Sequence, residues 1–88
     1  MRTVFEADHV SAILDAERAI YPRVDDAWQA LTWWISREPD SGVLIDDVHW
    51  LYKQEGSHRL KIPALVILYT FDHQCVEILS VLVRVPIC

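Results

Sequence analysis

The sequence predicts an α+β fold in which a pair of helices packs on one face of an antiparallel sheet. The strongest sign lies in the last third of the chain, where residues 63–71 and 75–84 are two long runs rich in β-forming side chains. Only the polar residues Asp72-His73-Gln74 separate them, so the two runs predict an antiparallel hairpin. The first half of the chain carries two segments with apolar residues at helical spacing. The predicted order of elements is therefore β-α-α-β-β-β.

A short strand and two helices are predicted before residue 43. Residues 2–6 form the strand, and the helix that starts near residue 7 ends at Pro22, because proline cannot continue the hydrogen-bond ladder of a helix. The second helix starts near Asp25 or Asp26 and ends at residues 38–42, which contain both Pro and Gly. Few residues join the two helices, so we expect them to lie antiparallel as a helical hairpin.

The remaining strands follow the helices. Residues 48–53 form the next strand, and residues 43–45 are either a further short strand or the entry to it. The final hairpin carries apolar side chains on both faces of each strand. In its first run the expected faces are Leu65, Ile67, Tyr69 and Phe71 against Val66 and Leu68. In its second run they are Val76, Ile78 and Leu82 against Leu79, Val81 and Val83.

A strand that is apolar on both faces is typical of the middle of a sheet that is covered on both sides. The chain has only 88 residues, which suffices for a single domain spanning residues 1–88. We therefore expect one of the two covers to be another chain. The apolar fraction of 52% supports this, because it exceeds the usual range of about 45–50%. A homodimer and a different partner protein are both candidates.

The charge and the composition exclude several classes of function. The formal net charge of −5 opposes non-specific binding to nucleic acid, so any such role needs a local basic patch. The four histidines lack metal-ligand spacing, and we expect no metal and no cofactor. The longest apolar run, residues 62–69, is far shorter than the roughly 20 residues of a membrane span. We expect a cytoplasmic protein in which Cys75 and Cys88 are reduced thiols.

Three segments of the chain carry a resemblance to a known family. Residues 30–42 end the second helix with a Leu, an acidic residue, a Pro and a Gly; residues 59–72 form a strand with a Tyr before an acidic turn; and residues 76–82 form a closing strand that runs on to Arg84. In this order they resemble the RelE/ParE superfamily of bacterial toxins from type II toxin–antitoxin modules. The resemblance implies a cognate antitoxin as partner and cleavage of mRNA on the ribosome.

The resemblance also implies the residues of an RNA-binding site. Lys53, Arg59 and Lys61 match the family's basic entry to the last hairpin, and Arg84 matches its closing Arg. Two positions depart from the family's pattern: Val66 stands where the central strand usually carries an Arg, and no Tyr or His follows Arg84.

Cleavage of RNA by its own 2′-hydroxyl needs a base, an acid and cations that stabilise the charge of the transition state. His58 and Tyr69 are the candidates for proton transfer, whereas Arg59, Lys61 and Arg84 would hold phosphate. Arg59 and Lys61 are two residues apart, so on a strand they would share one face. We expect Arg84 and Tyr69 to lie beside them.

Other interpretations of the same residues stay open. Arg59 and Lys61 equally suit a partly exposed strand, whose charges prevent pairing with other chains. The chain can also be a non-catalytic member of the same fold, either a gyrase-directed toxin or a degenerate protein that only binds an antitoxin. A third interpretation is a small structural dimer of unrelated purpose.

Overall fold

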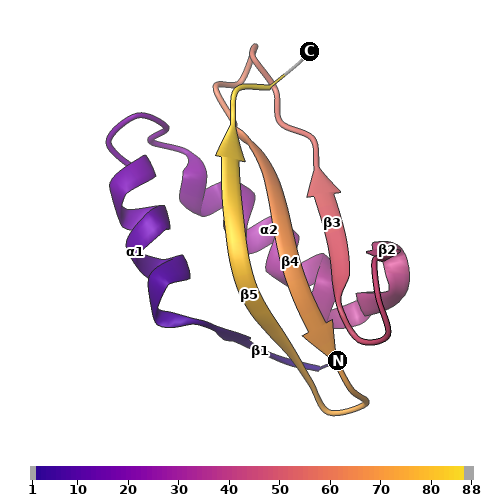
Figure 1. Ribbon diagram of the computed structural model, residues 1–88. Coiled ribbons are helices and arrows are strands. Elements are labelled where there is room, and N and C mark those ends of the chain that lie inside the picture. Colours follow the sequence, from indigo (N-terminus) through magenta and orange to yellow (C-terminus); the bar gives the residue numbers. More distant parts are fainter. Residues whose placement is uncertain (1, 87–88) are drawn as a thin grey trace.

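Two helices pack against a five-stranded sheet in the computed structural model, which describes residues 2–86 (Figure 1). The predicted α+β class is confirmed. In chain order the elements are β1 (Thr3–Glu6), α1 (Asp8–Glu17), α2 (Val24–Arg37), the 3₁₀ turn η1 (Pro39–Ser41), β2 (Val43–Leu44), β3 (Trp50–Gln54), β4 (Ala64–Phe71) and β5 (Cys75–Arg84).

The sheet is mixed and has the strand order β1-β5-β4-β3-β2. The expectation of a purely antiparallel sheet is wrong, because β1 pairs parallel to β5. The three other pairings, β2–β3, β3–β4 and β4–β5, join strands that follow one another in the chain. In contrast, β1 is the first strand and β5 is the last, and all the other elements lie between them in the sequence. Residues 43–45, for which the sequence left a short strand open, contain the strand β2: Val43 pairs with Leu51 and Leu44 with Trp50.

The final hairpin is confirmed in its bounds and its direction. The two runs form β4 and β5, which pair antiparallel and occupy inner positions of the sheet. A register shift lies at Leu68 and Tyr69: Leu68 pairs with Ser80, but Tyr69 pairs with Ile78, so Leu79 is an extra residue on β5. This bulge reverses the alternation of side chains along β5.

The bulge corrects one expectation about the faces of β5. Val81 and Val83 pack in the same core as Val76 and Ile78, rather than opposite them. Leu82 instead lies on the other face, where half of it is exposed. On β4, the predicted division between Leu65, Ile67 and Tyr69 on one face and Val66 and Leu68 on the other is confirmed by burial and register.

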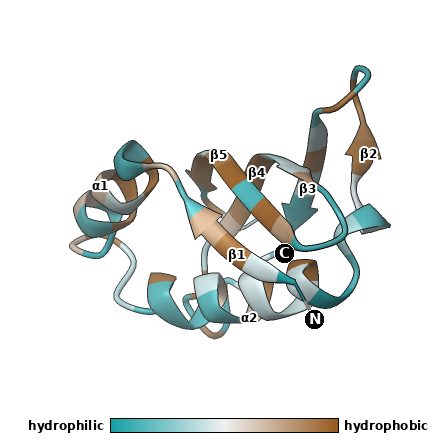
Figure 2. Cartoon of the chain, turned by 90° about the horizontal axis from the view of Figure 1, so that it is seen from below, coloured by the Kyte–Doolittle hydropathy of each residue, from teal (hydrophilic) through white to brown (hydrophobic). Residues whose placement is uncertain are grey.

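The helices cover one face of the sheet and leave the other open (Figures 1 and 2). α2 buries a stripe of side chains three or four residues apart, Ala27, Trp28, Leu31 and Ile35, and α1 adds Val10 and Leu14. These pack on the inward side chains of β4 and β5. We call the opposite surface of the sheet the open face. No helix within residues 2–86 has the length and apolar character needed to span a membrane.

The two cysteines differ in what the structure describes. Cys75 is a free, partly exposed thiol at the start of β5. Burial and the nearby carboxylate of Asp72 raise the pKa of this thiol, so it is a weak nucleophile. Cys88 lies outside the described residues.

Candidate functional site on the open face of the sheet

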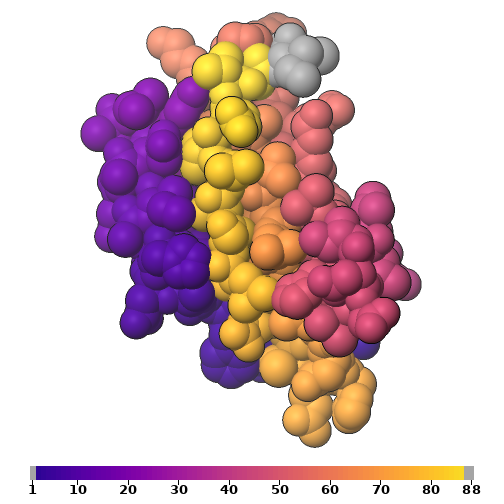
Figure 3. Space-filling model, in the orientation of Figure 1, coloured from indigo at the N-terminus to yellow at the C-terminus, as the bar shows by residue number. Residues whose placement is uncertain are grey.

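The open face is lined with aliphatic side chains. Leu51 of β3, Val66 and Leu68 of β4, and Leu82 of β5 follow one another across three paired strands. Leu51 and Leu82 remain 39% and 50% exposed, because no element of residues 2–86 packs over them. Figure 3 looks onto this face, with β5, β4 and β3 side by side. An uncovered apolar surface of this kind is typical of a binding surface.

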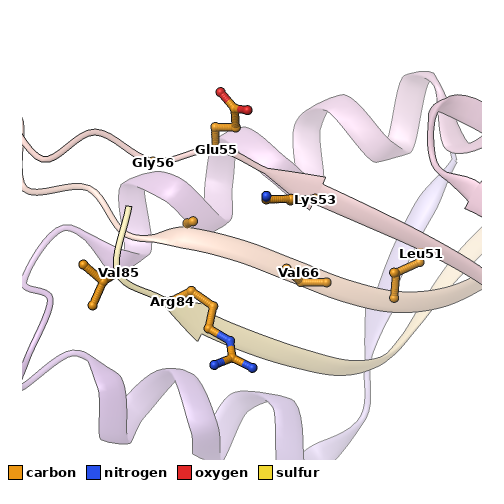
Figure 4. A pocket seen from close by; sticks show the side chains of 8 residues that line it. Leu51, Lys53, Glu55, Gly56, Val66, Arg84 and Val85 are labelled. Atoms are coloured by element: carbon orange, nitrogen blue, oxygen red, sulfur yellow. The ribbon is translucent and has the colours of Figure 1, made fainter. Parts of the chain in front are cut away.

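A groove of about 530 Å³ lies at the end of the open face where β3 and β5 finish (Figure 4). Its lining residues come from β3, from the start of β4 and from the last residues of β5: Leu51, Lys53, Glu55, Gly56, Ala64, Val66, Arg84 and Val85. Most of this lining is apolar, and the charged side chains stand at its edges.

Lys53 and Arg84 are the two cations of the groove. Lys53 pairs with Val66 and Arg84 pairs with Ala64, so both side chains project on the open face from the two sides of β4. Two strand spacings, about 10 Å, separate their strands. Both are exposed, and neither forms a salt bridge within residues 2–86. Glu55 is the one carboxylate that lines the groove, so the two cations outnumber it.

Arg59 and Lys61 do not share a strand face, which corrects the expectation from their spacing. Residues 58–61 form an exposed turn, because Ser57 and Ile62 exchange two backbone hydrogen bonds of 2.8 and 2.9 Å. Lys61 adopts a left-handed backbone conformation with φ of 58°, which ends any extended run before β4 begins. His58 lies in the same turn.

The turn nevertheless lies near the groove. Figure 1 shows the connection from β3 to β4 at the same end of the sheet as the last residues of β5. Arg23, the residue before α2, contacts this turn: its Nη1 donates a hydrogen bond to the carbonyl of Leu60 at 3.3 Å. His58, Arg59 and Lys61 therefore flank the groove from a turn, outside its lining.

Tyr69 lies on the opposite side of the sheet from Arg84, so the expectation that the two are adjacent is wrong. Its side chain is fully buried beneath the helices, and its hydroxyl donates to the carbonyl of Pro39 at 2.6 Å. Burial raises the pKa of Tyr69 to about 12. A phenol that is sealed from the open face in this way cannot exchange protons with a ligand in the groove.

The groove has the chemistry of a binding site. Its floor is apolar and its rim carries two cations, so it suits a ligand that combines aliphatic groups with an anionic group. No histidine lines it, and residues 2–86 contain no group of three or more side chains arranged to hold a metal ion. Of the residues predicted from the sequence, Lys53 and Arg84 line this groove, whereas Glu55 and the apolar floor were not predicted.

β2 and the connection that follows it form a second feature that the sequence did not reveal. Four large aliphatic side chains of this segment are more than half exposed: Val43, Leu44, Ile45 and Val48. Asp46 shapes the connection by accepting hydrogen bonds from the backbone N–H groups of Val48 and His49 at 2.9 and 2.7 Å. These bonds and the His49 ring hold the pKa of Asp46 below its ordinary value.

Comparison with protein-family models, with curated proteins and with solved structures gives no significant match for this chain.

Proposed function

We propose that this chain is a RelE/ParE-like component of a type II toxin–antitoxin module that binds its cognate antitoxin on the open face and does not cut RNA itself. The observation that carries the proposal is the uncovered apolar groove with Lys53 and Arg84 at its edges. Aliphatic side chains of a partner would fill the groove, and a carboxylate of the partner would pair with the two cations.

The two residues predicted to transfer protons, His58 and Tyr69, lie outside the groove lining, which favours binding over catalysis. RNA cleavage needs a base and an acid within hydrogen-bond reach of the reacting oxygens. Tyr69 is buried on the other side of the sheet, and the ring of His58 belongs to an exposed turn outside the lining. Val66, at the position where the family's central strand usually carries an Arg, contributes to the apolar floor.

A ribosome-dependent mRNA endonuclease is the second candidate. The favouring observation is that Lys53 and Arg84 project on one face while Arg59 and Lys61 lie in the turn at the same end of the sheet. Four cations at one end would counter the net charge of −5 where a phosphate backbone would lie.

Induced expression in a bacterial host separates these functions. Growth, mRNA integrity and gyrase-dependent DNA breaks are measured for the wild type and for the double variant Lys53→Ala, Arg84→Ala. Arg37→Ala is the matched control, because Arg37 is an exposed cation stacked on Trp33 of α2, in the helical layer. We expect intact mRNA in every culture, and binding of the purified wild type to the product of a short reading frame next to its gene. Cleavage of mRNA in the wild-type and Arg37→Ala cultures, but not in the culture of the double variant, would establish the endonuclease instead.

A further inference from the structure

β2 and the connection that follows it protrude on the same side of the sheet as the groove. We call this segment, residues 43–48, the knob. Figure 2 shows it projecting away from the helical layer, with apolar residues along β2, and Figure 3 shows it standing beside the open face. Val43 is 67% exposed and Ile45 54% exposed, and with Leu44 and Val48 they group exposed aliphatic side chains in one short segment, which is the kind of surface that marks an interaction site.

Asp47, an acidic residue of the knob, is available to a partner molecule. Asp46 is occupied by the backbone of Val48 and by His49. Asp47 is exposed and makes no side-chain hydrogen bond or salt bridge within the described part of the chain. The knob therefore offers aliphatic groups together with one unpaired carboxylate.

The groove offers the complementary set. Its floor of Leu51, Val66 and Val85 is apolar, and Lys53 and Arg84 at its edges have no salt-bridge partner among residues 2–86. The knob thus satisfies both requirements of the groove, an aliphatic group for the floor and an anion for the rim. Glu55 offsets one cation and leaves a net positive rim.

The positions of the two features allow two copies to satisfy each other. The knob lies at the end of the sheet where β3 begins, and the groove lies at the end where β3 finishes (Figure 1). A half-turn about an axis that is parallel to the sheet and oblique to the strands exchanges the position of the knob, at the β2 edge, with that of the groove, over β3 to β5. In a face-to-face pair, each knob then meets the groove of the other copy, as a closed two-fold dimer requires.

We infer that a second copy of this chain covers the open face, with the knob of each copy in the groove of the other and Asp47 paired with Lys53 across the interface. A stable interface buries about 800 Å² on each partner. That area is a sizeable share of the total accessible surface of 5622 Å², and the exposed aliphatic side chains of the open face and the knob contribute to it: Val43, Leu44, Ile45, Val48, Leu51 and Leu82. The inference concerns the chain without its antitoxin: the second copy and the proposed antitoxin would compete for the same face, so binding of one displaces the other.

Exchange of the paired charges gives a sharp test by sedimentation velocity over a series of concentrations. We expect the wild type to dimerise. Asp47→Lys and Lys53→Asp each place like charges at both contacts of the dimer, and each should weaken it by about tenfold or more. An equimolar mixture of these two variants should recover the dimer, because each contact then joins opposite charges again. Asp47 and Lys53 are both exposed, and neither forms a salt bridge within residues 2–86, so folding should be unchanged. Circular dichroism will verify this.

A matched pair of isoleucines tests the apolar part of the contact. Ile45→Asp in the knob should give a monomer, whereas Ile20→Asp should leave the dimer intact, since Ile20 is 67% exposed in the connection between the helices. A monomeric wild type, a mixture of charge variants that stays monomeric, or equal effects of the two Ile variants would each overturn the inference. None of these results depends on an antitoxin, so the proposed function is tested separately.

Discussion

The hydroxyl of Tyr69 donates a 2.6 Å hydrogen bond to the carbonyl of Pro39 and thereby joins the centre of the sheet to the turn that ends α2. Both residues are buried. Gly42 completes this contact, because a Cβ there would lie only 2.5 Å from the Tyr69 hydroxyl and from the carbonyl oxygen of Leu51. Tyr69 is therefore part of the packing that holds α2 against β4, which explains why it is unavailable for chemistry on the open face.

Tyr69→Phe should destabilise the fold by about 1–3 kcal/mol, because it leaves the buried carbonyl of Pro39 without its partner. Chemical denaturation measures the free energy of unfolding. Tyr52→Phe is the matched control: Tyr52 lies on the same face of the adjacent strand, and its hydroxyl makes no hydrogen bond within residues 2–86. That change should cost less than about 0.5 kcal/mol. Equal losses in the two variants would mean that the hydrogen bond contributes nothing.

The raised pKa of Tyr69 predicts a loss of stability in alkali. Burial raises the pKa of Tyr69 to about 12 in the folded protein, from its ordinary value of 10.0. In the unfolded chain the phenol loses its proton first, so stability is fully present below pH 10 and falls as the pH rises toward 12. Denaturation curves at a series of alkaline pH values should show this decline in the wild type and a shallower one in Tyr69→Phe. Parallel declines would refute the assignment.

Asp46 should stabilise the knob in its charged form. Its pKa lies below the ordinary 3.8 because the N–H groups of Val48 and His49 donate to the carboxylate. The stabilisation is present above about pH 4 and is lost as the pH falls through the lower pKa of the folded state. Asp46→Ala should therefore accelerate amide exchange at Val48 and His49 at neutral pH, while Asp46→Asn, which keeps an acceptor oxygen, should do so less. Unchanged exchange in the alanine variant would contradict this role.

The strand pairings that the sequence predicts are those between strands close together along the chain. The β4–β5 hairpin was predictable because its strands adjoin a three-residue turn and consist almost entirely of β-forming side chains. The parallel pairing of β1 with β5 was not, because no local signal joins residues so far apart along the chain. The bulge at Leu79 was also not predictable, since no Gly or Pro stands there to mark an irregular strand.

Only two residues of the candidate site, Lys53 and Arg84, were predicted from the sequence, and its geometry was not. Lys53 and Arg84 followed from the resemblance, but their common face depends on the register that sets Lys53 opposite Val66 and Arg84 opposite Ala64. The same register sends Tyr69 to the other face. Arg59 and Lys61 lie in a turn outside the sheet, because Lys61 has a left-handed backbone conformation. Their spacing of two residues does not predict this conformation.

Removal of the two groove cations should separate binding from folding. The double variant Lys53→Ala, Arg84→Ala should unfold within about 0.5 kcal/mol of the wild type, because both side chains are exposed. Its affinity for the purified antitoxin should fall, and the remaining binding should depend less on salt than that of the wild type, since ion pairs at the rim are screened. An identical salt dependence in both proteins would show that these cations do not contact the partner.

The most direct test of the open face as the binding surface is isothermal titration calorimetry of the antitoxin against the wild type, Leu82→Asp and Ile20→Asp. Leu82 is 50% exposed on the open face, and Ile20 is 67% exposed outside it, so both variants should fold. A buried carboxylate at position 82 should weaken binding by about tenfold or more, while the Ile20 variant binds like the wild type. Wild-type affinity in Leu82→Asp would contradict the assignment of the open face as the functional surface of this protein.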